Sequence, residues 1–135
     1  MAEKTMNLIY NALRTPDGTV LTSRHRHDYV THTDKNGKEY MIDGGLDYVR
    51  SSANGDEEYL TVTIGADHSV CREACEWGTY GINGDQPLSY IKLCDMDTAH
   101  IEAVLENVND RIRPSIKEMM KEELQFRNTL TDFGV

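Results

Sequence analysis

The chain has 135 residues, of which 39% are hydrophobic and 27% are charged, and its formal net charge is −9. These values fit one folded domain over residues 1–135 rather than a disordered chain. The acidic excess lies in residues 51–135, which hold seven Lys/Arg against sixteen Asp/Glu. Such a charge disfavours binding to long nucleic acid, which needs many phosphate contacts, but a small anion in a local basic pocket is permitted.

Features of the whole chain point to a soluble protein of the cytoplasm. No segment reaches the roughly 20 apolar residues that are needed to cross a bilayer. The first five residues have neither the apolar core nor the cleavage site of a signal peptide. The three cysteines are an odd number, which favours reduced thiols in a cytosol.

Turn signals divide the first two thirds of the chain into strands. Residues 7–23 are predicted to form a hairpin around residues 15–18, where proline presets one turn dihedral and glycine accepts a positive φ. Residues 29–42 are predicted to form a second hairpin around an Asn-Gly step. Residues 46–50 fit either a helical turn or a short strand. Residues 59–64 alternate as a half-buried strand does.

Helical spacing begins after Asp67, and this helix is expected to carry Trp77 and to end at Gly78. The sheet-rich part covers residues 5–93, with a last strand at residues 89–93. Two C-terminal helices follow within residues 97–128. The predicted fold class is therefore α+β: an antiparallel sheet with one inserted helix and two C-terminal helices that help to form a homo-oligomer.

Capping residues predict where the two C-terminal helices begin. Asp97 or Thr98 caps the first helix, and Pro114 suits the first turn of the second, where its missing N–H costs nothing. The apolar residues of the second helix include two methionines, which suit an interface that repacks. The residues that we assign to this face are Ile116, Met119, Met120, Leu124 and Phe126.

The densest basic cluster of the chain lies at residues 24–28. In an extended segment Arg24 and Arg26 would share one face and could fork a phosphate, although the same pattern also fits an edge strand protected by charge. His25 and His27 could both contact one metal ion, but a third ligand with convincing spacing is missing. We therefore expect no metal and no cofactor.

Two further groups are candidates for ligand binding. Arg113, Lys117 and Lys121 recur every four residues beside an apolar helix face, where they could hold an anion. The competing interpretation is a solvated face on which these cations pair with Glu118, Glu122 and Glu123. Trp77 and Tyr80 lie where a helix is expected to meet a loop, so they could stack on a base, whereas a single tryptophan is also typical of a core.

Nothing in the sequence predicts catalysis. A glycine-rich phosphate loop, a nucleophile elbow, a CxxC pair and an HExxH motif are all missing from the sequence. Cys71 and Cys75, four residues apart on a helix, are expected to act as small buried hydrophobes. We expect a binding protein without a catalytic residue.

Several long motifs resemble the phage Thoeris anti-defence sponges of the first type. They are YNALRTPDGT at residues 10–19, SRHRHDY at 23–29, YMIDGGLDY at 40–48, WG at 77–78, HIE at 100–102 and ELQFR at 123–127. The resemblance implies C-terminal helices that dimerise, with larger assemblies up to a hexamer. It also implies that the chain sequesters cyclic ADP-ribose isomers intact in the host cytoplasm. Some members of this family also bind cyclic oligonucleotides at a separate site.

The resemblance also implies roles for particular residues. An aromatic side chain stacks the adenine, for which Trp77 or Tyr80 is the match. Cations on the C-terminal helix of the partner subunit hold the phosphates, for which Arg113 with Lys117 or Lys121 is the match. Arg24 and Arg26 are candidates for either anionic site. Where the family has a second helical arginine, this chain offers a lysine, which cannot fork a phosphate.

Overall fold

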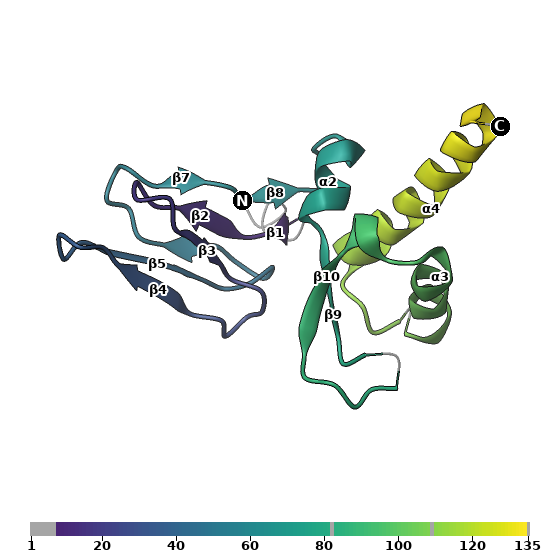
Figure 1. Ribbon diagram of the computed structural model, residues 1–135, viewed down its shortest axis with the longest axis horizontal. Helices are drawn as coiled ribbons and strands as arrows, with labels where there is room; N and C mark the ends of the chain where they lie inside the picture. Colours follow the sequence, from purple (N-terminus) through teal and green to yellow (C-terminus); the bar gives the residue numbers. More distant parts are fainter. Residues whose placement is uncertain (1–7, 82, 109, 135) are drawn as a thin grey trace. The chain divides into compact units, whose positions relative to one another are not determined.

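The computed structural model describes residues 8–81, 83–108 and 110–134 (Figure 1). The chain forms two compact units, of which one ends at Gly65 and the other begins at Ala66. The prediction of a single domain stays a prediction. Antiparallel strand pairs combine with the helices α2 (His68–Ala74), α3 (Thr98–Asn107) and α4 (Pro114–Gly134), which confirms the α+β class.

Both predicted hairpins are present in the first unit. Strand β2 (Ala12–Arg14) pairs with β3 (Val20–Thr22), and β4 (Val30–Thr33) pairs with β5 (Glu39–Asp43), both antiparallel. Gly18 closes the first turn with a φ of +89°, a conformation that glycine adopts without strain. Local turn chemistry therefore sets the register of both hairpins.

Two segments that were each predicted as one strand are divided. β1 (Leu8–Tyr10) pairs with β8 (Val62–Thr63), whereas β2 pairs with β7 (Glu58–Tyr59). The chain thus passes from one sheet to another at Asn11, and it does so again between β7 and β8. Asn7, where the first strand was expected to begin, lies outside the described residues.

The undecided segment 46–50 is a turn that leads into a strand. β6 (Arg50–Ser51) pairs with β5 and completes a three-stranded sheet, order β4-β5-β6. A second three-stranded sheet has the order β3-β2-β7. A hydrophobic cluster joins residues of these two sheets, and it consists of Leu13, Leu21, Tyr40 and Ile42 with Val30 packed against them.

The second unit begins with a helix that is shorter than expected. α2 (His68–Ala74) has Asp67 at its N-cap, as predicted, but the expected helix end at Gly78 is wrong. Cys75 is already extended, and the chain continues as β9 (Glu76–Thr79), which pairs with β10 (Ser89–Lys92). Trp77 is therefore a strand residue. Figure 1 shows β9 and β10 as one hairpin.

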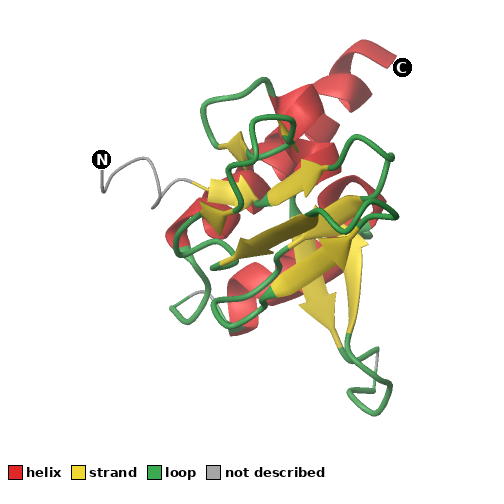
Figure 2. Ribbon diagram, turned by 90° about the vertical axis from the view of Figure 1, so that its left-hand side faces the viewer, coloured by secondary structure: helices red, strands yellow, loops and turns green. Residues whose placement is uncertain are grey.

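After the short helix η1 (Leu93–Asp95), two helices complete the second unit (Figure 2). α3 (Thr98–Asn107) has Asp97 at its N-cap, and α4 (Pro114–Gly134) begins with its proline, which confirms both predictions. Their buried positions recur at helical spacing, at Ile101, Val104, Ser115, Ile116, Met119, Met120 and Glu123. Met119 and Met120 are therefore covered within the chain itself and do not offer the exposed surface that was expected for an interface. Within the described residues, no helix has the length and apolar character of a membrane span.

Candidate functional site

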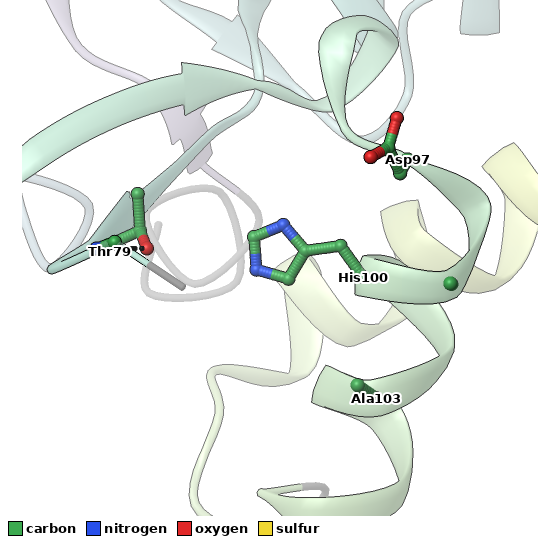
Figure 3. Close-up of a pocket in the computed structure, with 6 residues that line it drawn as sticks. Thr79, Asp97, His100 and Ala103 are labelled. Carbon is green, nitrogen blue, oxygen red and sulfur yellow. Dashed lines mark hydrogen bonds between the residues drawn. The ribbon is translucent and has the colours of Figure 1, made fainter. Parts of the chain in front are cut away.

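A cavity of about 580 Å³ lies in the second unit between the end of β9 and the start of α3 (Figure 3). This volume is within the usual range of small-molecule sites. The described residues that line it are Thr79, Gly81, Asp97, Ala99, His100 and Ala103.

Small residues leave this space open. Ala99 and Ala103 lie one helical turn apart on α3, where larger side chains would fill the cavity. Gly81 has a φ of +88°, and a Cβ atom there would lie 2.7 Å from Cγ of Gln86. The backbone N–H of Gly81 donates to the hydroxyl of Thr79 at 3.1 Å, which fixes the turn that leaves β9.

Three polar side chains give the cavity its chemistry. His100 extends from α3 toward Thr79 across the cavity, as Figure 3 shows. Asp97 is exposed and makes no capping hydrogen bond to α3. An imidazole, a hydroxyl and a carboxylate can together bind ribose hydroxyls and a base edge. None of the described lining residues is Lys or Arg, so this wall by itself does not favour a phosphate.

The two predicted stacking residues lie next to the lining segment. Trp77 is half-buried on β9 opposite Ile91, and Tyr80 is 55% exposed. Side chains alternate along a strand, so Trp77 lies on the same face of β9 as Thr79, which lines the cavity. Neither aromatic residue belongs to the described lining itself.

The predicted cation stripe on α4 does not line the cavity. Arg113 precedes the helix, and its carbonyl accepts the Lys117 N–H at 3.0 Å, so Arg113 lies at the cap. Arg113 and Lys117 are half-buried, and Lys121 is exposed. Within the described part of the chain, neither lysine forms an ion pair within 4.0 Å, and the predicted pairing of this stripe with Glu123 is wrong.

Glu123 instead forms a buried ionic cluster that the sequence analysis missed. Its fully buried carboxylate accepts hydrogen bonds from Nε2 of His68 at 2.8 Å, from Arg72 at 2.8 and 2.9 Å, and from Nε of Arg127 at 2.7 Å. Burial raises the pKa of Glu123, but hydrogen bonds from these partners outweigh it and lower the pKa to about 2. The sequence offered one signal for this burial: Glu123 lies seven residues after Ile116, so both residues fall on the apolar face of α4.

The basic cluster of the first unit is a turn and not an extended segment. The Asp28 N–H donates to the carbonyl of His25 at 2.9 Å, and the Arg24 N–H donates to the Asp28 carboxylate at 2.8 Å. The expected strand geometry, and with it the edge-strand interpretation, is therefore wrong. Arg24 and Arg26 are exposed on this turn and belong to the unit that does not contain the cavity.

Two of the three cysteines are buried in the second unit, as the sequence predicts. Cys71 and Cys75 are buried, and burial raises the pKa of the Cys75 thiol to about 12, so this thiol is unreactive at neutral pH. Among the described residues, no group of three or more His, Cys, Asp or Glu side chains could hold a metal ion.

Comparisons of the chain with protein-family models, with curated proteins and with solved structures found no match. The likeness to the anti-defence sponges therefore rests on the motifs of the sequence, and the functional roles that it implies are proposals.

Proposed function

We propose that this protein binds a small cyclic nucleotide signal, such as a cyclic ADP-ribose isomer, and holds it intact as a phage anti-defence sponge in the host cytoplasm. The observation that carries the proposal is the cavity of about 580 Å³ in the second unit, lined by a histidine, a threonine and an aspartate. The sequence motifs at residues 77–78 and 100–102 support it, because they flank or contain residues of this cavity.

The side chains that line the cavity indicate which part of the ligand it binds. We assign a nucleoside part to the cavity, where the Asp97 carboxylate accepts from ribose hydroxyls and His100 contacts the base. The negative charge of Asp97 would repel a phosphate group in the cavity, so the phosphates of the ligand lie outside the cavity. Arg113, Lys117 and Lys121 of a second copy would hold them, which makes the functional form a homo-oligomer, a dimer or a hexamer.

One observation favours a competing function. An imidazole that extends into a cavity can also act as a general base, so the same site could hydrolyse the signal. An inhibitor that covers a host enzyme with its acidic second half is a third alternative, and it predicts no small-molecule ligand.

The test is recovery of the ligand. The protein is incubated with cyclic ADP-ribose isomers and with cyclic oligonucleotides, freed of unbound ligand, heated, and the released molecules are identified by mass spectrometry. Intact ligand in stoichiometric amount supports the sponge, and hydrolysed ligand supports the enzyme. If nothing is released, and a host protein co-purifies instead, the inhibitor function replaces our proposal. The Glu102→Ala variant is the control, because Glu102 is exposed on α3 and is not among the lining residues.

A further inference from the structure

One guanidinium links the buried ionic cluster to the wall of the cavity. Arg127 of α4 donates from Nε to the Glu123 carboxylate at 2.7 Å and from Nη1 to the Thr98 hydroxyl at 2.8 Å. Its Nη2 donates to the carbonyl of Leu93 at 3.2 Å. A single planar group thus contacts α4, the first residue of α3 and the first residue of η1.

The contact with Thr98 lies inside the segment that forms the cavity wall. Thr98 stands between Asp97 and Ala99, which both line the cavity, and two residues before His100. Leu93, the other contact, is buried, and its N–H donates to the carbonyl of Cys75 at 2.8 Å. The Arg127 guanidinium therefore ties the first residue of α3 to α4 and to the start of η1.

The buried carboxylate holds Arg127 in one orientation. Oε1 of Glu123 accepts from Nε2 of His68 and Nε of Arg72, and Oε2 accepts from Nη2 of Arg72 and Nε of Arg127, so each oxygen has two hydrogen bonds. The Arg72 guanidinium in turn lies over the ring of Phe126, 4.7 Å from its centroid. The bidentate contact with Arg72 holds the carboxylate in place, and the Nε bond to this carboxylate together with the bonds to Thr98 and Leu93 holds the plane of the Arg127 guanidinium.

We propose that Arg127, oriented by Glu123, is the positioning residue of the cavity and sets its ligand affinity by holding the first turn of α3 in place against α4. This inference rests on the proposed function for its effect on affinity, but its effect on the cavity wall can be measured without a ligand. Lysine cannot replace Arg127, because one ammonium group does not reach three acceptors in the planar arrangement of a guanidinium.

The test removes only the hydroxyl that Arg127 contacts. Thr98→Val keeps the shape of this exposed side chain but removes the hydroxyl that accepts the hydrogen bond from Arg127. Thr98→Ser keeps the hydroxyl and is the matched control. For each variant, three quantities are measured: the melting temperature, the NMR signal of the His100 imidazole without ligand, and the affinity for cyclic ADP-ribose. Arg127→Lys is a second variant with the same readouts.

We expect Thr98→Val to shift the His100 signal and to weaken affinity about two- to tenfold, the value of one hydrogen bond, with a nearly unchanged melting temperature. Thr98→Ser should match the parent in all three. A parent-like His100 signal in both Thr98→Val and Arg127→Lys would overturn the inference. If the parent binds no cyclic nucleotide, the proposed function fails, and the His100 signal alone then decides whether Arg127 positions the wall.

Discussion

Replacing Glu123 by glutamine should destabilise the second unit more than any substitution of an exposed acidic residue. Glutamine has nearly the same shape, so the change leaves no cavity. It removes the negative charge, however, and turns one acceptor oxygen into an NH₂ group that faces the donors of Arg72 and Arg127. Two guanidiniums then lie against a partner that no longer neutralises them.

The size of the effect follows from burial. Removing one partner of a buried ion pair costs about 3–5 kcal/mol, and we expect the lower part of this range because the remaining guanidiniums of Arg72 and Arg127 are 25% and 21% exposed. Since a domain of this size is stable by only about 5–15 kcal/mol, Glu123→Gln should lose roughly a fifth or more of the free energy of unfolding. The melting temperature should fall by about 10 °C or more.

The matched control is the neighbouring residue. Glu122 is 41% exposed and lies 4.0 Å from Nδ1 of His68, so Glu122→Gln should cost about 0–1 kcal/mol. Both variants and the parent are unfolded in urea while circular dichroism is recorded. If Glu123→Gln is as stable as Glu122→Gln, the ionic cluster does not stabilise the fold and our reasoning about it fails.

The same carboxylate predicts how stability depends on pH. The pKa of Glu123 is lowered from 4.5 to about 2 in the folded protein. Its stabilising contribution is therefore complete above about pH 4.5 and is lost as the pH falls through 2, because the unfolded state binds the proton first. In this window the parent should lose free energy of unfolding more steeply than Glu123→Gln; parallel curves would refute the assignment.

Three further predictions concern ligand, assembly and metal. Arg113→Ala should weaken nucleotide affinity about ten- to a hundredfold with little change in melting temperature, and Arg113→Lys should lose part of the affinity; parent-like binding by both would place the phosphate site elsewhere. Sedimentation should show a homo-oligomer, and a monomer at micromolar concentration would contradict this. Chelation of divalent ions should leave the melting temperature unchanged, whereas a drop of several degrees would indicate a structural metal, for example at His25 and His27.

Features that depend on a few neighbouring residues could be predicted from the sequence. The turn that ends at Gly18 and the helix starts at Asp97 and Pro114 are set by local dihedral preferences and caps, so both hairpins and both C-terminal helices were found. The end of α2 was missed, because residues 76–79 become a strand only by pairing with residues 89–92. The spacing of apolar residues within one segment cannot reveal that this segment pairs with a strand ten or more residues away in the chain.

The same limit applies to the candidate site. The position of Glu123 on the apolar face of α4 was readable, but its partners His68 and Arg72 lie 55 and 51 residues away in the chain. No spacing rule connects such residues. The cavity likewise depends on small residues of α3 that lie beside the end of β9, and β10 and η1 separate these two segments in the chain.

The central claim is that a nucleotide occupies the cavity beside His100. The most direct measurement is calorimetric titration of cyclic ADP-ribose into the parent, into His100→Ala and into Glu102→Ala, whose substitution lies on the same helix but outside the lining. We predict equal affinity for the parent and Glu102→Ala and an affinity about tenfold or more weaker for His100→Ala. Binding by His100→Ala as tight as that of the parent, or no binding by the parent, would contradict this claim.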